Sequence, residues 1–201
     1  MTRPNPTLLL PLLVILSLGP SARAADPAPA AATPDSAKAE PSVAETTRTA
    51  TGQEAPAFTV ETLGGSPFSL AGQRGKVVLV NWFATWCGPC KAEMPALKTQ
   101  VWERFGADPR FAMISVSRAE EAAKVKAFVA DRGLPWTFGL DTGRKAYALY
   151  ADAYIPRNYV IGPDGRIVFQ SEGYQEEEFA AMVAAIAGQL GQLAGAGGGG
   201  R

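Results

Sequence analysis

The sequence predicts an α/β fold in which a central mixed sheet is flanked by helices and covered on both faces. Strand and helix patterns alternate over residues 54–190, as is typical of such sheets. Residues 77–83 are an almost continuous apolar run, which indicates a strand buried on both faces. Towards the end of the chain, two strands joined by a tight turn precede an amphipathic helix. This late hairpin is what makes the predicted sheet mixed.

The first elements follow from turn residues and apolar runs. Residues 58–61 and 68–70 flank Gly64-Gly65 and predict an N-terminal β-hairpin extension. The strand 77–83 is followed by a helix to about Arg104, which we expect to kink at Pro95 because proline lacks a backbone N–H.

The later elements carry capping and turn signals. Residues 111–116 form a second central strand, and Ser117 with Glu120 reads as a capping box that opens a helix ending near Gly133. A short helix over 145–150, a strand over 159–161 and a strand over 167–170 follow. The last helix starts with three glutamates and has an apolar face made of Phe179, Met182, Val183, Ile186 and Leu190.

Composition removes several classes of function. The 201 residues contain 19 Lys and Arg, 19 Asp and Glu, two Cys and no His. Without imidazole there is no Ser-His-Asp or Cys-His catalysis, no His-ligated metal and no haem held by a proximal His. The balanced charge argues against a nucleic-acid partner, because such proteins need a basic surface to neutralise phosphates.

The N-terminal region is typical of an exported protein. Residues 1–24 read as a signal peptide: Arg3 is followed by an apolar run over 8–18 and by an Ala-Arg-Ala cleavage site at 22–24. The run is short for a membrane span, but an uncleaved anchor stays an alternative. The expected location is periplasmic or otherwise extracytoplasmic, with membrane attachment only if this segment is retained.

Two further segments lack the apolar residues that a core needs. Residues 25–53 are rich in Ala and Pro and predict a disordered linker. Residues 191–201 predict a flexible glycine-rich tail, so the folded domain is expected over 54–190.

Cys87 and Cys90 form a C-x-x-C pair at the junction of the buried strand and the following helix. Four interpretations compete. A zinc site needs about four ligands, and c-type haem attachment needs a His where Lys91 stands. A purely structural disulfide across so short a loop stabilises little, about 2 kcal/mol or less. A redox-active dithiol explains the placement best, because a helix N-terminus stabilises a Cys87 thiolate while Cys90 lies one turn inside.

The segment that starts at Asn81, NWFATWCGPCKAEMP, resembles the extracytoplasmic thioredoxin-like proteins of the TlpA/ResA/CcmG group, whose pattern is W-C-x-x-C-x-x-E-x-P. The resemblance extends over about residues 54–190. It implies a thioredoxin-like fold and thiol:disulfide oxidoreductase activity, with Cys87 as nucleophile, Cys90 as resolving cysteine and a Cys87–Cys90 disulfide in the oxidised state. No cofactor and no metal is implied.

The resemblance also implies a substrate-binding surface beside the dithiol. Pro156 would be a cis-proline, which leaves the main chain of Ile155 free to pair with an extended peptide. Trp86 would form an apolar rim, and Gly88-Pro89 shapes the loop between the cysteines. Arg157 and Asn158 depart from the small hydroxyl residues common in the family, and Arg157 could stabilise the thiolate, select acidic substrates or point to solvent.

Glu93 follows Cys90 by three residues and so shares its helical face. Cytoplasmic thioredoxins use a buried Asp on the preceding strand for proton transfer, and this chain has Asn81 there instead. Glu93 is therefore the expected proton carrier for Cys90, if burial raises its pKa. The alternative is an ordinary solvated surface glutamate.

The predicted function is reduction of disulfides in envelope proteins, with a membrane thiol-electron donor to regenerate the dithiol. Substrates in cytochrome c maturation or oxidase copper-site assembly fit the resemblance. Two alternatives remain: a non-enzymatic peptide- or copper-binding module, and a peroxiredoxin-type peroxidase. The peroxidase needs a P-x-x-x-T-x-x-C motif, whereas Thr85 lies only two residues before Cys87.

Overall fold

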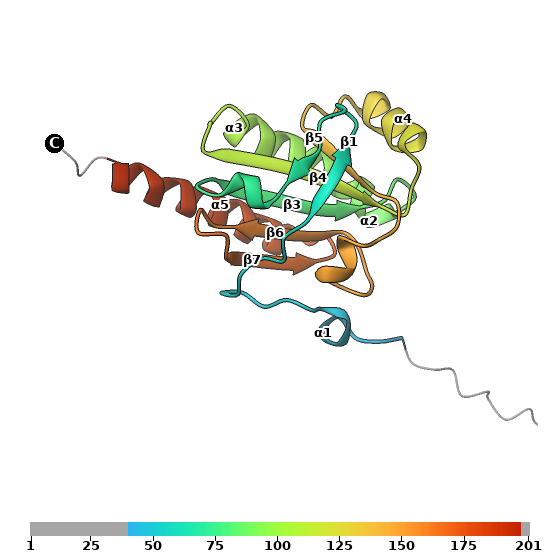
Figure 1. Ribbon diagram of the computed structural model, residues 1–201, viewed down its shortest axis with the longest axis horizontal. Coiled ribbons are helices and arrows are strands. Elements are labelled where there is room, and N and C mark those ends of the chain that lie inside the picture. Colours follow the sequence, from blue (N-terminus) through green and yellow to red (C-terminus); the bar gives the residue numbers. More distant parts are fainter. Residues whose placement is uncertain (1–39, 198–201) are drawn as a thin grey trace, which may run out of the picture. The chain divides into compact units, whose positions relative to one another are not determined.

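The computed structural model describes residues 40–197, and Figure 1 shows them as one sheet with flanking helices. The strands in this range are β1 (Thr59–Thr62), β2 (Phe68–Ser69), β3 (Val77–Phe83), β4 (Phe111–Arg118), β5 (Thr137–Asp141), β6 (Arg157–Ile161) and β7 (Ile167–Glu172). Their order across the sheet is β2-β1-β5-β4-β3-β6-β7. β4 pairs in parallel with β3 and β5, and the remaining pairs are antiparallel. The mixed sheet and the N-terminal hairpin β1–β2 are thereby confirmed.

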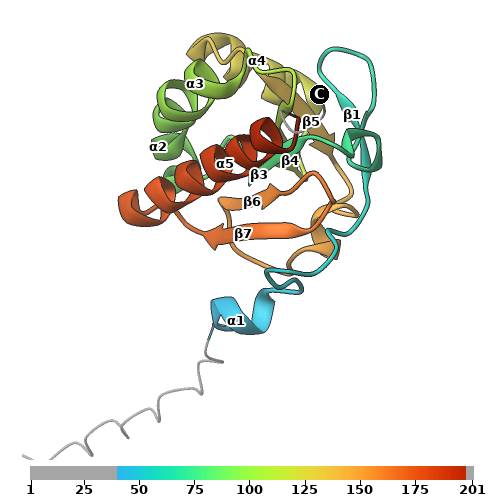
Figure 2. The same cartoon turned by 90° about the vertical axis from the view of Figure 1, so that its left-hand side faces the viewer.

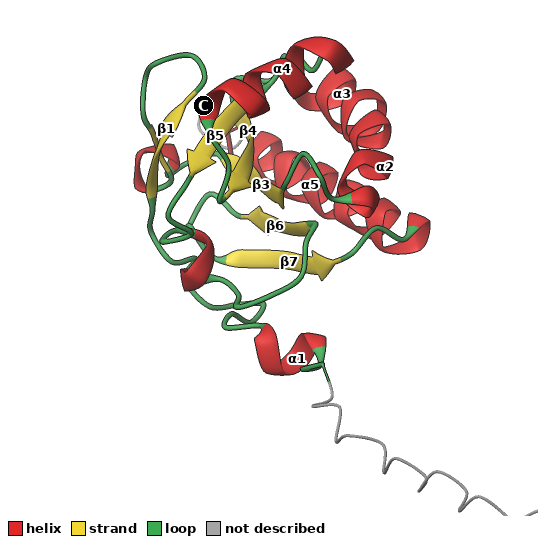
Figure 3. Cartoon of the chain, turned by 90° about the vertical axis from the view of Figure 1, so that its right-hand side faces the viewer, coloured by secondary structure: helices red, strands yellow, loops and turns green. Residues whose placement is uncertain are grey.

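The main helices cover one face of the sheet. They are α2 (Gly88–Ala96), η2 (Leu97–Trp102), α3 (Glu103–Phe105), α4 (Ala122–Arg132) and α5 (Glu176–Gly197). Figures 2 and 3 show them together on the same side of the strands. The other face is covered by shorter pieces, namely the 3-10 turns η1 (Ala71–Gln73) and η3 (Tyr147–Leu149) and the chain before β1.

Successive side chains of β3 point to opposite faces of the sheet and belong to two different apolar cores. Val77, Leu79 and Phe83 pack under the helices, where they meet the apolar face predicted for α5. Val78, Val80 and Trp82 point to the opposite face, towards a cluster of aromatic rings around Tyr147 and Tyr150. Every residue of β3 is buried, as the apolar run indicates. This double burial fixes the end of β3, and with it the start of the cysteine loop.

The helix after the cysteines runs without a break from Gly88 to Phe105, but it changes from α-helical to π-helical hydrogen bonding just after Pro95. Because Pro95 cannot donate a backbone hydrogen bond, the helix widens into the π-helical stretch η2. The hydroxyl of Thr99 donates to the carbonyl of Pro95 at 3.0 Å. The irregularity predicted at Pro95 is therefore present, and the helix ends at Phe105, within one residue of the predicted end.

Two elements between 117 and 141 differ from the prediction. Ser117 lies in β4 rather than at a helix cap, and α4 begins later with Glu121 as its N-cap. The strand β5 was not among the predicted elements, and it contains a glycine, Gly139, which weakens a strand pattern. A Cβ at Gly139 would lie 2.8 Å from a methyl of Val60 and 3.0 Å from one of Ile114, so this glycine permits close strand packing.

The domain is longer at both ends than the predicted 54–190. Residues 40–53 are ordered rather than a disordered linker: they form the short helix α1 (Val43–Thr46), and Thr47 bridges Ala151. At the other end α5 continues to Gly197, where a tail was predicted. The signal peptide at 1–24, the linker over 25–39 and the last residues 198–201 lie outside the described range.

None of the helices in residues 40–197 has both the length and the apolar character needed to cross a membrane.

Candidate active site

The cysteine pair lies at the end of β3, where the chain turns into α2. Cys87 is the N-cap residue of α2, and Cys90 lies in its first turn. The two sulfurs form a disulfide, and the backbone N–H of Cys90 points at Cys87 Sγ from 3.2 Å. Cys90 is completely buried, whereas Cys87 is 4% exposed. Cys87 is therefore the sulfur nearer to solvent, and its Sγ lies where a helix N-terminus favours negative charge.

The loop that precedes β6 faces the dithiol. The peptide bond between Ile155 and Pro156 is cis, which confirms the cis-proline implied by the resemblance. The carbonyl oxygen of Ile155 lies 3.6 Å from Cys87 Sγ. The cis-proline loop and the cysteine loop are thus neighbours in space, although Cys87 and Ile155 are 68 residues apart in the sequence.

A shallow groove lies over Cys87 between these two loops. Trp86 stands at its rim with 59% of its surface exposed. The lining residues are Trp86, Cys87, Gly88, Pro89, Arg118, Ala153, Tyr154 and Ile155. Four of the residues expected to contact substrate therefore gather here, whereas Pro156 itself is buried behind Ile155.

Arg118 and Tyr154 in the groove were not predicted from the sequence. Arg118 ends β4, whose register pairs Ser117 with Phe83 at the end of β3. Because parallel strands end at the same edge of a sheet, a polar residue at the end of β4 must lie near the loop that follows β3. This topological signal was present in the sequence, and it would have identified Arg118.

Glu93 lies in α2, three residues after Cys90, and is fully buried, so it is not a solvated surface residue. Its carboxylate accepts hydrogen bonds from the side-chain amides of Asn81 and Asn158, the former at 3.0 Å. Asn81 also donates to the side-chain amide oxygen (Oδ1) of Asn158 at 2.9 Å. Both asparagines are buried, and Asn158 had no assigned role in the sequence.

Burial raises the pKa of Glu93 from 4.5 to about 7. The hydrogen bonds from Asn158 and Asn81 act in the opposite direction, since they stabilise the charged form, but desolvation dominates. A carboxyl group with this pKa exchanges its proton near neutrality, which an ordinary glutamate does not.

The amide of Asn81 is held in turn by a chain of buried polar groups. Ser115 donates to the Asn81 carbonyl oxygen at 2.9 Å, and the indole N–H of Trp136 donates to the Ser115 hydroxyl at 2.9 Å. These bonds fix which way the Asn81 amide points, with its N–H group towards Glu93. The chain extends from α2 through β3 and β4 to the residue before β5.

A narrow crevice connects Glu93 to the protein surface between β7 and α5. It is lined by Glu93, Asn158, Ser171, Gly173, Tyr174, Gln175, Glu178 and Phe179, and it is too narrow to hold a water molecule in this conformation. Gln175 and Glu178 at its outer end are exposed.

Arg157 does not take the position that the sequence suggested. Its side chain is only 2% exposed and does not line the groove, so it neither points to solvent nor meets an acidic substrate. The guanidinium donates to the hydroxyls of Thr46 and Thr47 at 3.0 and 2.9 Å and to the carbonyl of Ala153 at 3.0 Å. The reason is the ordered segment around α1, which covers this arginine.

A buried carboxylate holds the loop that leads into Cys87. Glu120 accepts from the backbone N–H of Thr85 at 2.7 Å, from the Thr85 hydroxyl at 2.6 Å and from Ser117 at 2.8 Å. Lys124 lies 3.0 Å from the same carboxylate. Although burial alone would raise the pKa of Glu120, these hydrogen bonds together lower it. Glu120 thus binds the loop that precedes Cys87 and does not form the predicted capping box.

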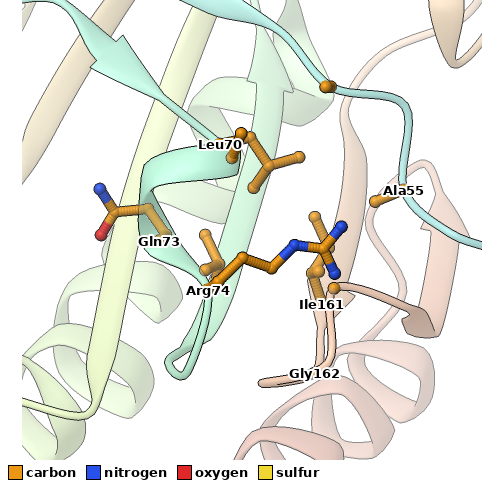
Figure 4. Close-up of a pocket in the computed structure, with 10 residues that line it drawn as sticks. Ala55, Leu70, Gln73, Arg74, Ile161 and Gly162 are labelled. Atoms are coloured by element: carbon orange, nitrogen blue, oxygen red, sulfur yellow. The ribbon is translucent and has the colours of Figure 1, made fainter.

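A second cavity lies at the other end of β3, far along the strand from Cys87. It is lined by Ala55, Leu70, Val78, Ile161 and neighbouring residues, and Figure 4 shows the side chain of Arg74 extending across it. Its volume of about 30 Å³ leaves room for about one water molecule. Among the described residues, no group of three or more acidic or thiol side chains is placed to hold a metal ion.

Comparison with known proteins agrees with this site. The model of the AhpC/TSA family matches residues 51–170. The chain is 33% identical over 127 residues to the thiol-disulfide oxidoreductase ResA of Bacillus thuringiensis, which covers 63% of this chain and 72% of ResA. It is 35% identical over 133 residues to the thiol:disulfide interchange protein HelX of Rhodobacter capsulatus, covering 63% of this chain and 70% of HelX.

The fold is also shared with solved structures. A proposed protein disulfide isomerase from Bacteroides thetaiotaomicron superposes with a TM-score of 0.70 at 38% sequence identity, covering 73% of this chain and 93% of that one. The sheet order, the disulfide-bonded C-x-x-C pair at a helix N-terminus and the adjacent cis-proline are together a thioredoxin-like active site. The chain belongs to the AhpC/TSA family and, with its relatives ResA and HelX, to the thioredoxin-like thiol-disulfide oxidoreductases.

Proposed function

We propose that this protein reduces disulfides in exported proteins, with Cys87 as the nucleophile and Cys90 as the resolving cysteine. The observation that carries the proposal is the asymmetry of the pair. Cys87 lines the groove, and its Sγ accepts a hydrogen bond from the backbone N–H of Cys90. Cys90 itself is completely buried. The accessible sulfur is therefore the one whose thiolate the helix N-terminus stabilises.

The exchange takes place in two steps. The Cys87 thiolate attacks one sulfur of a substrate disulfide, forms a mixed disulfide and releases the other sulfur as a thiolate. Cys90 then loses its proton and attacks Cys87 Sγ, which releases the second substrate thiol and leaves the Cys87–Cys90 disulfide. Two electrons pass from the protein to the substrate, and the disulfide form described above is the product state.

Substrate would lie along the groove as an extended segment. Trp86, Gly88 and Pro89 form one side and Ile155 the other, with cis-Pro156 behind it. The Ile155 carbonyl, 3.6 Å from Cys87 Sγ, would pair with the backbone of the segment that carries the substrate cysteine.

Glu93 would take the proton that Cys90 loses. Its pKa near 7 matches the reaction pH, and the buried amides of Asn81 and Asn158 hold its carboxylate in one orientation. The crevice between β7 and α5 would return the proton to solvent when it opens.

The proposed setting is the extracytoplasmic space, with residues 1–24 as an export signal or a retained anchor and residues 25–39 as a linker. The domain proper then spans residues 40–197. In an oxidising compartment the dithiol does not persist without a supply of electrons, so a membrane thiol donor would regenerate it. By family resemblance, the substrates would be disulfides of apocytochrome c or of copper-site proteins of respiratory oxidases, which the reaction returns to thiols.

Insulin reduction tests the proposal. In the presence of dithiothreitol the wild-type protein should accelerate insulin reduction, and Cys87→Ser should reduce insulin no faster than dithiothreitol alone. Cys90→Ala should instead trap a mixed disulfide at Cys87, which mass spectrometry identifies in extracts of envelope proteins. Wild-type rates in Cys87→Ser would contradict the assigned nucleophile.

A further inference from the structure

The groove over Cys87 contains one charged side chain, and within residues 40–197 no carboxylate forms an ion pair with it. Among the eight lining residues only Arg118 carries charge. Its Nη1 is buried and has no hydrogen-bond partner among the described residues. The guanidinium packs over the ring of Tyr147, so part of its hydrogen-bonding capacity stays unused in the described structure.

The hydrogen bonds and ion pairs of the nearest carboxylates in the described part of the chain go to groups other than Arg118. Asp141, its register neighbour on β5, accepts from the backbone N–H of Tyr147 at 2.7 Å. Asp152 pairs with Arg48 at 2.7 Å. Glu120, two residues along the chain, binds Thr85, Ser117 and Lys124.

Two further arginines lie in the same region as Arg118. The guanidinium of Arg118 lies 4.7 Å from the centre of the Tyr147 ring, and that of Arg144 lies 5.7 Å from the same ring. Arg157 is the third arginine in this region, and the oxygens that bind it are neutral hydroxyls and a carbonyl. The residues that line the groove therefore carry one positive charge and no negative charge.

From this arrangement we infer that Arg118 selects substrates that carry an acidic side chain next to the cysteine attacked by Cys87. The inference rests on the proposed function, and it names the substrate class of that site. A carboxylate beside the substrate cysteine would be attracted by Arg118, the one charged residue of the groove lining, while the apolar parts of the segment contact Trp86, Pro89 and Ile155. A lysine at the same place would meet a like charge.

Three symmetric disulfide dimers of one short peptide test the inference, with glutamate, glutamine or lysine before the cysteine. The reduced protein is mixed with each dimer, and the released peptide thiol is measured over time. Each rate is divided by the rate with dithiothreitol, which corrects for the effect of the neighbouring charge on the reactivity of the disulfide itself. A ratio of rates also cancels any general slowing in a variant.

The wild-type protein should reduce the glutamate peptide about fivefold faster than the lysine peptide after this correction. The preference should shrink as NaCl rises from about 20 mM to about 500 mM, since salt screens the charges. Arg118→Gln should bring the ratio close to one, and Arg118→Lys should keep most of it. Arg144→Gln is the matched control, because Arg144 faces the same ring without lining the groove, and it should keep the preference.

The possible failures are distinguishable. Equal corrected rates for the three peptides in the wild type, or a preference that salt does not change, would overturn the inference while leaving the proposed function intact. A preference that persists in Arg118→Gln would show that another group selects the substrate. If the wild type reduces none of the peptides although dithiothreitol reduces all three, the proposed function fails and the inference fails with it. The salt series needs no variant, so the test holds even if Arg118→Gln does not fold.

Discussion

Glu93 combines complete burial with two amide donors, and these features act on its pKa in opposite directions. Desolvation favours the neutral acid, whereas the N–H groups of Asn158 and Asn81 favour the carboxylate. The balance places the pKa at about 7, where both protonation states are populated. The same amides leave the carboxyl group little freedom to rotate. Glu93 is therefore tuned and oriented by Asn81 and Asn158.

Replacing Glu93 by Gln should slow the resolving step by about 10²-fold, because Cys90 would lose its proton acceptor. The first attack by Cys87 should change much less, so the mixed disulfide should accumulate in a single turnover. The rate of resolution should also lose most of its pH dependence around neutrality. Rapid acid quenching followed by mass spectrometry measures the intermediate over time.

The exposed Glu177→Gln in α5 is the control for this variant and should behave as the wild type. Identical resolution rates for Glu93→Gln and wild type between about pH 5 and about pH 9 would refute the role of Glu93.

At the residue scale, the sequence was informative where chemistry is local. The spacing of Cys87, Cys90 and Glu93 along one helix could be read directly, because residues three apart share a helical face. Asn158 and Arg118 could not be assigned in this way, since their partners lie 65 residues away on α2 or come from the ends of other strands. Arg157 was misjudged for the same reason: its partners Thr46 and Thr47 precede it by 111 and 110 residues.

At the scale of elements, the segment Pro41–Arg48 is a strap over the loop that forms one wall of the groove. Its helix α1 is closed by a capping box between Ser42 and Glu45. The strap binds the loop through Arg157, through the backbone N–H of Asp152 to Thr46 at 2.8 Å, and through the hydroxyl of Tyr154 to Pro41 at 2.6 Å. The groove residue Tyr154 and the cis-proline loop are therefore fixed partly by residues more than 100 positions earlier.

Thr46→Val tests the strap with a substitution that keeps the shape of the side chain. The hydroxyl of Thr46 is one of the oxygens that bind the buried Arg157, so its loss leaves an N–H of a charged group unpaired. We expect a loss of about 2 kcal/mol in the free energy of unfolding. Urea denaturation of the oxidised protein measures it, with the exposed Thr142→Val as the matched control. A loss no larger than that of the control would mean that Arg157 finds another partner.

The two elements that the sequence did not predict, β5 and the strap, both depend on contacts with residues far away in the sequence. β5 contains Gly139, which weakens a strand pattern, yet its missing side chain is what lets Val60 and Ile114 approach. The low apolar content of the strap predicts disorder. Polar contacts to a distant loop order it instead. Apolar periodicity predicted β3, β4 and α5 well, because their order comes from burial.

At the scale of the whole molecule, two buried carboxylates make stability depend on pH in opposite directions. The hydrogen bonds of Glu120 lower its pKa, so its contribution is present above the pKa of the unfolded chain and is lost as the pH falls through the lower, folded value. Glu93 has a raised pKa, from 4.5 to about 7, so its contribution is complete below about pH 4.5 and is lost as the pH rises towards 7. The pH range in which Glu120 changes the stability therefore lies below the pH range in which Glu93 changes it.

Few other groups of this chain change their protonation state in the pH range over which Glu93 titrates. The sequence has no histidine, the residue that normally titrates between pH 5 and 8, and both cysteines are bonded in the oxidised form. Between about pH 4.5 and about pH 7 the folded protein binds more protons than the unfolded chain, so the free energy of unfolding should fall as the pH rises. A shift from 4.5 to about 7 corresponds to roughly 3 kcal/mol over the whole window.

Urea denaturation of the oxidised protein at about pH 5 and about pH 8 measures this loss, and Glu93→Gln should abolish most of it. The variant is expected to be less stable than the wild type at pH 5, because a Gln amide group directed at Asn81 or Asn158 places donor against donor. The comparison therefore rests on the change between the two pH values and not on either value alone. A wild-type loss that survives in Glu93→Gln would assign the pH dependence to another group, and the pKa of Glu93 would then have to lie outside this window.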